Sequence, residues 1–399
     1  MSSQQLYLFN PDNDLALANG DTNYMPPASA RQMAVDLALL PVWYAEADSF
    51  VLAPSAYNQA FLKEMQAAFG LPVTLMTTPE MAATPSIHPV PWGWNAALRK
   101  QLRQGGIPDN ELPAPEAIVK FRYLSHRQRA VELLPRLQMG SGFCGQSAYL
   151  TDAQAWKDFV ETHDHSLLKA PLSGSGKGLN RCRGVFTPFV SGWCARVAHT
   201  QGGIVAEPVY DKVEDFAMEF RADGKGAVCF AGYSLFATTA GGAYEGNLLL
   251  SDEAIEQRLS AYVPLSDIER LRQRLEQELS VLIGSDYVGF LGVDMMICRF
   301  ADALPLYRIH PCVEINLRMN MGMVARCLYD CYVVPDGSGV FRVVYHATPG
   351  EALKEHERMT AEHPLRIDGG RVLSGYLPLV PVTARSLYTA WMRIDLSTY

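Results

Sequence analysis

The stretch LLKAPLSGSGKGL, residues 167–179, joins a short apolar strand to a glycine-rich turn. Residues 167–170 predict the strand, which carries Lys169, and residues 173–178 form the turn. Backbone N–H groups in such a turn can converge on an anion, because glycine has no Cβ to obstruct them. The stretch therefore predicts a phosphate-binding loop, with a ligand-free surface loop as the alternative. The turn consists of Ser173, Gly174, Ser175, Gly176, Lys177 and Gly178.

The stretch differs from the P-loop of many nucleotide-binding proteins. A P-loop follows the pattern G-x-x-x-x-G-K-[ST], so that a helix N-terminus meets the phosphates and a hydroxyl meets magnesium. In this sequence Pro171 holds the place of the first glycine, and Gly178 follows Lys177 where the hydroxyl residue should stand. The P-loop pattern therefore fails at two positions.

Two later segments place oxygen ligands on apolar strands. The segment YVGFLGVDMMI carries one acid, Asp294, and the segment CVEIN carries Glu314 and Asn316. A carboxylate on an apolar strand is costly unless a cation or a hydrogen-bond partner compensates it. Because strand side chains alternate, Glu314, Asn316 and Arg318 share one face. The pattern predicts a magnesium site shared with substrate phosphates, with a core strand and a buried ion pair as the alternative for each segment.

In this order, the motifs resemble those of the ATP-grasp superfamily. The ordered set is a strand lysine, the glycine turn, an acidic hinge at residues 204–210, an acid on a G-x-D strand, and E-x-N-x-R from Glu314 to Arg318. The resemblance covers roughly residues 120–322, about half of the chain. It implies a two-subdomain ATP-grasp fold that uses ATP and Mg²⁺.

The resemblance also implies roles for individual residues. Lys169 resembles the lysine that reaches the α- and β-phosphates, and residues 173–178 resemble the lid over the β- and γ-phosphates. Arg318 resembles the arginine beside the reacting phosphate, so Arg318 and Lys169 are the catalytic candidates. The implied magnesium ligands are Asp294, Glu314 and Asn316. The other implied nucleotide contacts are Glu207 and the backbone of Val209 for adenine, Asp215 for the ribose, and Arg127 as a first basic contact, with Lys120 and Arg129 as its rivals.

The pattern of strands and helices predicts a mixed α/β (α+β) fold. Strands and helices alternate over residues 1–115, which predicts a small N-terminal domain with a parallel sheet. Residues 116–209 would form the small ATP-grasp subdomain with the glycine loop, and residues 210–330 the large subdomain with the metal site. Residues 331–399 would form a short C-terminal β appendage.

Several local predictions bear on the site. Residues 84–91 predict a loop because they hold three prolines, residues 124–137 predict one helix containing Arg127, and residues 266–283 predict an amphipathic helix. Residues 10–23, rich in Asn and Asp, predict either turns or a binding loop. The glycine-rich residues 238–247 predict either a mobile hairpin or a loop on the acceptor side.

The composition limits the class of protein. Of 399 residues, 48% are hydrophobic and 19% charged, so the chain can bury more than one core. A net charge of −8 argues against a duplex nucleic-acid partner, which requires a basic face. No run approaches ~18 consecutive apolar residues, and eight scattered cysteines without C-x-x-C predict buried thiols in a reducing compartment. We therefore expect a cytoplasmic protein with no nucleic-acid or membrane partner.

The resemblance implies a carboxylate–amine ligase as the leading function. ATP would phosphorylate a carboxylate, and an amine would then displace phosphate. The expected partners are a small-molecule carboxylate and amine, with amino acids among the candidates and a homodimer left open. Two alternatives also remain open: an ATP-grasp kinase that stops at phosphorylation, and a nucleotide-binding regulatory protein without turnover.

Overall fold

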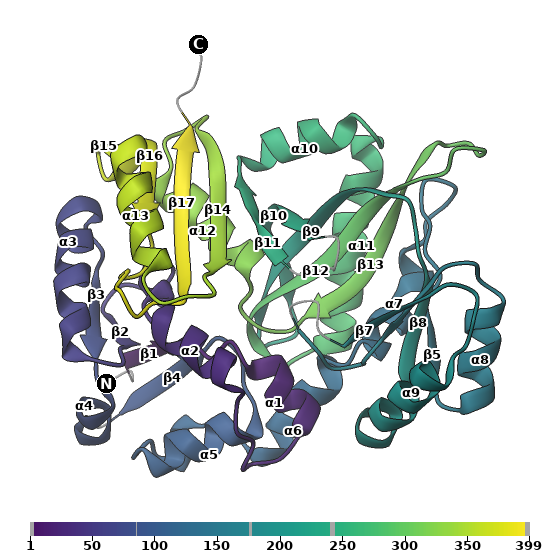
Figure 1. The fold of residues 1–399 in the computed structure, drawn as a ribbon, viewed down its shortest axis with the longest axis horizontal. Coiled ribbons are helices and arrows are strands. Elements are labelled where there is room, and N and C mark those ends of the chain that lie inside the picture. Colours follow the sequence, from purple (N-terminus) through teal and green to yellow (C-terminus); the bar gives the residue numbers. More distant parts are fainter. Residues whose placement is uncertain (1–3, 85, 175–177, 240–243, 396–399) are drawn as a thin grey trace.

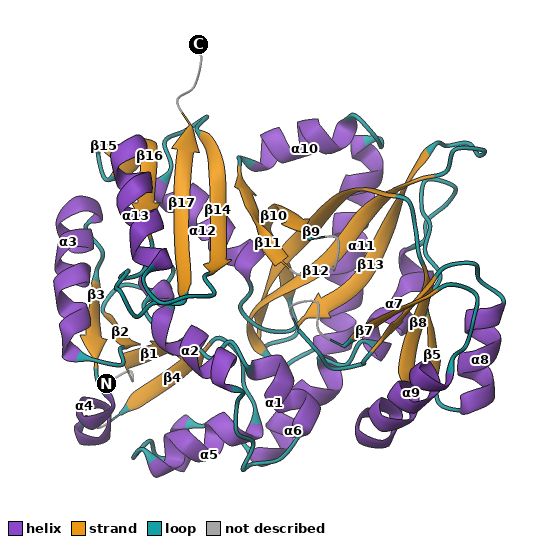
Figure 2. Ribbon diagram, in the orientation of Figure 1, coloured by secondary structure: helices purple, strands orange, loops and turns teal. Residues whose placement is uncertain are grey.

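The computed structural model describes residues 4–84, 86–174, 178–239 and 244–395, and its strands form three sheets (Figures 1 and 2). One sheet is parallel, and the paired strands of the two others are antiparallel, with helices packed around them. The predicted mixed α/β fold class is therefore confirmed. Among the described residues, no helix is both long and apolar enough to cross a membrane.

The first domain is built on the parallel sheet. Its strand order is β3 (Val73–Met76), β2 (Ser49–Leu52), β1 (Gln4–Leu8) and β4 (Ile87–Pro91). Its helices are α1 (Asn13–Asn19), α2 (Ala28–Asp36), α3 (Gln59–Phe69), α4 (Thr78–Ala83) and α5 (Ala96–Gln104), and the short 3₁₀ helices are η1 (Leu40–Trp43), η2 (Ala56–Asn58) and η3 (Asp109–Glu111). The predicted strand and helix alternation of this region is present.

The loop predicted for residues 84–91 is wrong, because β4 occupies most of that segment. Pro89 and Pro91 belong to the strand and lie opposite Leu6 and Leu8 of β1. β4 lies at the edge of the sheet and pairs only with β1, so the missing N–H groups of the prolines can face away from any neighbour. The prolines therefore mark an edge strand.

The second sheet lies on the right in Figure 1 and has the order β5 (Ala148–Leu150), β8 (Ile204–Pro208), β6 (Ser166–Lys169) and β7 (Leu179–Cys182). Helices α8 (Ala153–Glu161) and α9 (Pro188–Gln201) pack against it. Two helices, α6 (Pro115–Leu124) and α7 (Gln128–Leu137), precede it. The helix predicted for residues 124–137 is present from Gln128 to Leu137, but its start is wrong, because Leu124 ends α6 and a turn separates the two helices.

In the part of the chain that the structure describes, the third sheet has nine strands. Their order is β13 (Tyr307–Asn316), β12 (Val288–Arg299), β9 (Lys212–Asp223), β10 (Val228–Thr238), β11 (Tyr244–Leu249), β14 (Ser338–Tyr345), β17 (Tyr388–Asp395), β16 (Arg371–Pro378) and β15 (Arg366–Asp368). Its helices are α10 (Asp252–Ser260), α11 (Leu265–Ile283), α12 (Met321–Tyr332) and α13 (Glu351–Glu362). The last four strands thus extend the same sheet, and the predicted domain boundaries stay predictions.

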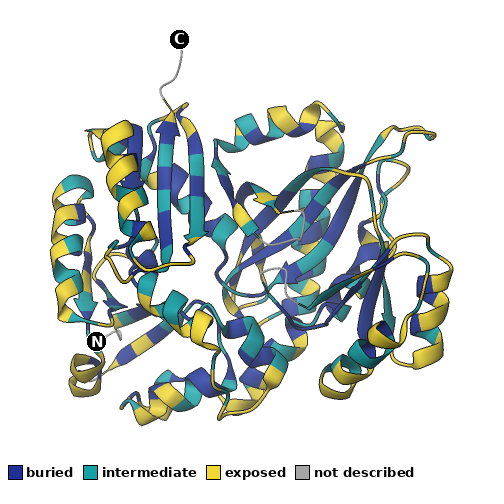
Figure 3. Ribbon diagram, in the orientation of Figure 1, coloured by how far each residue is buried: buried dark blue, intermediate teal, exposed yellow. Residues whose placement is uncertain are grey.

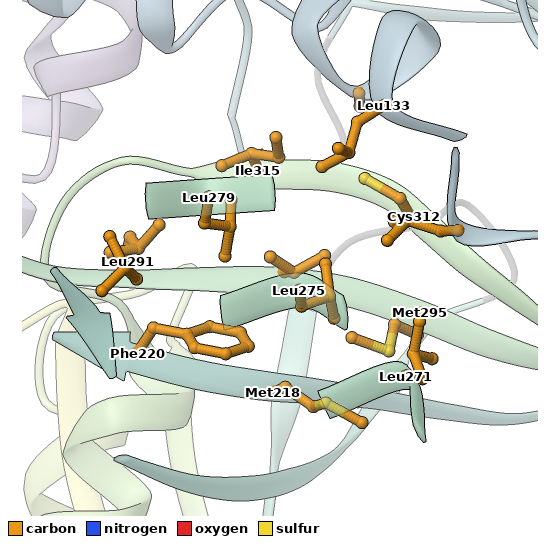
Figure 4. Packing of buried hydrophobic residues seen from close by; sticks show 14 of the residues in the cluster. Leu133, Met218, Phe220, Leu271, Leu275, Leu279, Leu291, Met295, Cys312 and Ile315 are labelled. Atoms are coloured by element: carbon orange, nitrogen blue, oxygen red, sulfur yellow. The ribbon is translucent and has the colours of Figure 1, made fainter. Parts of the chain in front are cut away.

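One face of this large sheet packs against α11, the helix that the sequence predicts as amphipathic. Leu271, Leu275 and Leu279 are fully buried, and they lie over apolar strand residues such as Phe220 and Met295 (Figure 4). Exposed residues lie mainly on the helices and loops, whereas the strands are largely buried (Figure 3). The opposite face of the sheet is partly covered by α12, which packs on β10 and β11, and the rest of that face is available for a functional site.

A second core ties the first domain to the last strands. Trp43 is 1% exposed, and its indole N–H donates to the carbonyl of Leu379 at 2.7 Å. Its ring meets Phe69 and Tyr332 edge-on, with centroids 5.4 and 5.1 Å away. The first domain and the C-terminal strands therefore share one interior.

We expect Trp43→Ala to lower the free energy of unfolding by about 3–5 kcal/mol, because the substitution leaves a cavity in this core and the Leu379 carbonyl without its hydrogen bond. Chemical denaturation followed by circular dichroism measures the change. Phe189→Ala, at a side chain that is 72% exposed on α9, is the control and should stay within about 0.5 kcal/mol of the parent. Equal effects of the two variants would contradict the shared interior.

Candidate active site

One cavity of about 1010 Å³ lies among the three sheets. Ser173 and Gly178 stand at the ends of the glycine turn, and Gly178 has a φ of +74°, which favours glycine. Ser175, Gly176 and Lys177 lie outside the described residues. The predicted site residues that line the cavity are Arg127, Lys169, Gly174, Glu207, Val209, Asp215, Asp294, Glu314, Asn316 and Arg318.

The predicted magnesium ligands come together on β12 and β13. Antiparallel register places Asp294 directly opposite Glu314, and Nδ2 of Asn316 donates to Oδ2 of Asp294 at 3.1 Å. Burial, together with the nearby charge of Glu314, raises the pKa of Asp294 to about 8. Two crowded carboxyl groups and an amide oxygen are a donor set that a hard divalent cation would neutralise.

These three side chains would fill only part of the coordination shell of a metal ion. Within the described parts of the chain, no group of three His, Cys, Asp or Glu side chains could hold a metal ion by itself. Magnesium sites commonly use one or two carboxylates and take their remaining oxygens from water and substrate phosphates. Asp294, Glu314 and Asn316 therefore fit a magnesium ion that arrives with a phosphate ligand.

The Arg127 side chain connects the glycine turn to the predicted magnesium ligands. The side chain is 6% exposed at the break between α6 and α7, and its guanidinium lies 2.7 Å from Oε1 of Glu314. The same guanidinium donates to the Ala170 carbonyl and to Oγ of Ser173, both at 2.6 Å. Its two rivals lie elsewhere: Lys120 pairs with Asp286 and Arg129 with Glu132, and the cavity lining includes neither Lys120 nor Arg129.

Lys169 and Glu207 form a buried ion pair on β6 and β8. Nζ of Lys169 lies 2.5 Å from Oε2 of Glu207, and both side chains are 5% exposed. In the following hinge, the Val209 N–H donates to the His165 carbonyl at 3.0 Å. Asp215 accepts from Nζ of Lys212 and from Oγ1 of Thr238, so it is held on the wall beyond the hinge.

Arg318 is clamped by a residue from the first domain. The guanidinium donates to both carboxylate oxygens of Asp14 at 2.6–3.1 Å and to Oδ1 of Asn316 at 3.0 Å. A Cβ on Gly174 would come within 2.5 Å of Oδ2 of Asp14, so the glycine turn also approaches this carboxylate. Asp14 therefore lies between the turn and Arg318.

Glu219, on β9, adds a further carboxyl group to the cavity wall. It is 1% exposed, accepts from Nδ2 of Asn320 at 2.8 Å and from Oγ of Ser234 at 3.1 Å, and lies opposite Gly292 of β12. Burial raises its pKa to about 7, although the hydrogen bonds from Asn320 and Ser234 work in the opposite direction. In the strand order of the sheet, Glu219 on β9 thus lies between the predicted magnesium ligands on β12 and β13 and the strands that begin with β10.

The arrangement of the three sheets recurs in solved structures, although no model of a protein family and no curated protein matches this sequence. Biotin carboxylase from Campylobacter jejuni, as its β-γ-ATP complex, has a TM-score of 0.51 and 12% identity over 99% of this chain and 88% of that chain. The chain has the ATP-grasp fold. The ATP-grasp resemblance stated from the sequence is confirmed at the level of the fold.

Two further ATP-grasp structures resemble the chain over nearly its whole length. N5-carboxyaminoimidazole synthetase from Staphylococcus aureus, complexed with ADP, has a TM-score of 0.47 and 11% identity over 100% of this chain and 94% of that chain. The biotin carboxylase domain of Hydrogenobacter thermophilus 2-oxoglutarate carboxylase, with MgADP, ADP and bicarbonate, has a TM-score of 0.47 and 11% identity over 99% and 87%.

Two residues of this candidate site do not follow from the sequence patterns above. Glu219 lies in the apolar run FAMEF, so the signal that marks Asp294 also exists there. Asp14 belongs to the Asn- and Asp-rich residues 10–23, for which a binding loop is one of two predictions. Its pairing with Arg318, a residue 304 positions away, has no local signature.

We expect the free energy of unfolding to fall as the pH rises from about 4.5 to about 7, because folded Glu219 keeps a proton that the unfolded chain has lost. The decline from one such group is at most about 1.4 kcal/mol per pH unit. Glu219→Gln, which is neutral throughout, should make this decline less steep in thermal unfolding between pH 4 and 8, while the decline due to Asp294, whose pKa burial also raises, remains. Glu116→Gln, at an exposed position on α6, is the control, and a Glu219→Gln profile parallel to it would refute the prediction.

Proposed function

We propose that this protein is an ATP- and Mg²⁺-dependent ligase that joins a carboxylate to an amine through an acyl phosphate. The proposal rests on one observation: the buried side chains of Lys169 and Arg127 lie in the same cavity as the predicted magnesium ligands. Arg318, which is held by Asp14, lines this cavity too. Phosphoryl transfer requires cations that bind phosphate, oxygen ligands for a metal ion, and an arginine beside them.

The nucleotide would enter between the second sheet and β13. Lys169 and Arg127 would bind the phosphates, Glu207 and the Val209 backbone the adenine, and Asp215 the ribose. Both cations now hold carboxylates, Glu207 and Glu314, so phosphate oxygens would replace part of these ion pairs. The glycine turn, residues 173–178, would supply further N–H groups to the phosphates.

The chemistry would proceed at Arg318. A carboxylate oxygen attacks the γ-phosphorus and ADP leaves; the amine nitrogen then attacks the acyl carbon, phosphate leaves and the amine loses a proton. Arg318 would stabilise the charge that develops on the transferring group, at the side next to Asn316. Magnesium held by Asp294, Glu314 and Asn316 would neutralise the phosphate oxygens.

A direct assay separates this proposal from its alternatives. The protein is supplied with ATP, magnesium and pooled carboxylates and amines, and the products are analysed by mass spectrometry. ADP together with a condensed product supports the ligase. ADP with a phosphorylated but uncondensed product indicates a kinase, and nucleotide binding without ADP formation indicates a regulatory protein.

We expect Glu314→Gln to lower ATP turnover by about 10²–10³-fold, the size of effect seen when one charge-stabilising group is removed from a transition state. Glutamine retains an acceptor for Arg127, so the fold should remain intact by circular dichroism. Glu278→Gln is the matched control, because Glu278 is also largely buried and also pairs with arginines, but outside the cavity. Turnover by Glu314→Gln equal to that of Glu278→Gln would contradict the metal assignment.

We expect Asp14→Asn to lower kcat by about tenfold and to change the KM for ATP little, since Asp14 orients Arg318 and does not itself bind the nucleotide. Steady-state kinetics measures both constants. Asp14→Glu, which restores the charge, should recover part of kcat, and Asp12→Asn removes a neighbouring charge as the control. A rise in KM with unchanged kcat would show that Asp14 has a different role.

A further inference from the structure

A buried histidine, His310, lies beside the place proposed for the nucleotide. It belongs to β13, is 0% exposed, and stands opposite Met296 of β12, which lines the cavity. Side chains that stand opposite each other on paired strands share one face of the sheet, whereas the preceding residue, Ile309, belongs to the core beneath α11. The imidazole therefore lies on the cavity side of the sheet, although the described lining of the cavity does not include it.

The imidazole of His310 lacks hydrogen-bond partners in the described part of the chain. Neither Nδ1 nor Nε2 forms a hydrogen bond with another described residue. Burial lowers the pKa of His310 to about 4, so the ring is neutral at physiological pH. Unpaired polar groups are uncommon in protein interiors, because each one costs free energy that an apolar side chain of similar size does not. A histidine at this position therefore needs a functional explanation.

A short segment of chain joins His310 to the ion pair between Lys169 and Glu207. A Cβ on Gly145 would come within 2.8 Å of Nε2 of His310, so the backbone of Gly145 lies against the imidazole. Two residues later, Oγ of Ser147 donates to Oε1 of Glu207 at 3.2 Å. Two residues of chain span at most about 7 Å, so the imidazole and the Glu207 carboxylate are close neighbours.

Two opposite charges act on the imidazole. The carboxylate of Glu207 on β8 raises the pKa of His310, and the ammonium of Lys169 on β6 lowers it. The protonation of His310 therefore depends on where these two charges lie. The other neighbours are Tyr210 of the hinge, whose ring meets the imidazole edge-on with centroids 5.6 Å apart, Cys144 of the segment before β5, Met296 of β12, Leu134 of α7 and, one pair further along β12 and β13, Asp294 and Glu314.

Nucleotide binding would disturb this balance. In the proposed function, Lys169 turns to the phosphates, and Glu207 keeps only the hydroxyl of Ser147 and the uncharged adenine as partners. The Glu207 side chain is 5% exposed, so its carboxylate would lose its counter-charge without gaining contact with water. Another cation must then replace Lys169, and the imidazole of His310 is the neighbouring group that can become one.

We propose that His310 is a positioning residue that takes over Glu207 when a nucleotide binds Lys169. The imidazole gains a proton from solvent and donates an N–H to the Glu207 carboxylate, which accepts it in place of the Lys169 ammonium. The proposal rests on the nucleotide site of the ligase function proposed above and adds a proton to the binding step. Because the pKa of His310 would be higher in the complex than in the free protein, nucleotide affinity should rise as the pH falls.

Nuclear magnetic resonance of the full-length protein, isotope-labelled at its histidines, measures the protonation of His310 directly. The His310 resonance is assigned by its loss in His310→Gln. Without nucleotide we expect the ring to stay neutral down to about pH 5, and with saturating MgADP we expect its midpoint above about pH 6, a rise of about 100-fold in proton affinity. His356, which burial also keeps from binding a proton but which lies on α13 outside the cavity, is the internal control and should not respond.

Lys169→Met tests the exchange without a nucleotide. The substitution removes the ammonium and keeps much of the apolar stem, so His310 should already bind a proton below about pH 6 in the free protein. In the double variant Lys169→Met with Glu207→Gln, the ring should again stay neutral over this range. Circular dichroism checks the fold of both variants, and if either unfolds, the titration of the parent with MgADP decides.

The affinity of His310→Gln for MgADP separates positioning from a structural role. Glutamine can donate a hydrogen bond to Glu207 but cannot supply a positive charge. We therefore expect calorimetry to show MgADP binding weakened by about tenfold near pH 5.5 and by less than about twofold near pH 8. A loss of packing alone would weaken binding equally at the two pH values, and that result would overturn the positioning role.

The outcomes keep this inference apart from the proposed function. A His310 ring that stays neutral down to about pH 5 with MgADP bound overturns the role of His310, and the nucleotide site stands. Absence of MgADP binding overturns the ligase function, and Lys169→Met still decides whether His310 pairs with Glu207. Protonation of His310 in the double variant to the same extent as in Lys169→Met would show that Glu207 is not its partner, and would overturn the inference as well.

Discussion

The three predicted cations that line the cavity in the described part of the chain are each held by a carboxylate from another segment. Lys169 on β6 pairs with Glu207 on β8, Arg127 pairs with Glu314 on β13, and Arg318 pairs with Asp14 on α1. Breaking a buried pair by removing one partner leaves an uncompensated charge, which costs about 3–5 kcal/mol. The three pairs therefore fix the first domain, the second sheet and the large sheet around one point.

These pairs also explain how the cavity can accept a highly charged ligand. Its cations and carboxylates are already desolvated and oriented, so a phosphate or a metal ion would exchange one partner for another. The carboxyl groups of Asp294 and Glu219, whose pKa values burial raises, accept hydrogen bonds from neutral side chains.

The sequence predicted the polar residues of the site better than the long-range contacts that hold them in place. Asp294, Glu314 and Asn316 stand out because alternation in an apolar strand is a local signal, and the structure places them together. Glu219 carries the same signal within FAMEF. Asp14 and Arg318 could not be paired in advance, since only the folded chain brings residues 304 positions apart into contact. The prolines of β4 led to the wrong prediction of a loop, because proline disrupts a central strand but is tolerated in an edge strand.

The hydrogen bond from Trp43 to Leu379 has a consequence for how the protein is made. Its two residues are 336 positions apart, so a ribosome that adds about 5–20 residues per second completes Leu379 roughly 17–70 s after Trp43. Until then, the apolar residues of the first domain that face the last strands lack their final cover. The first domain therefore completes its interior only after the last strands have been synthesised.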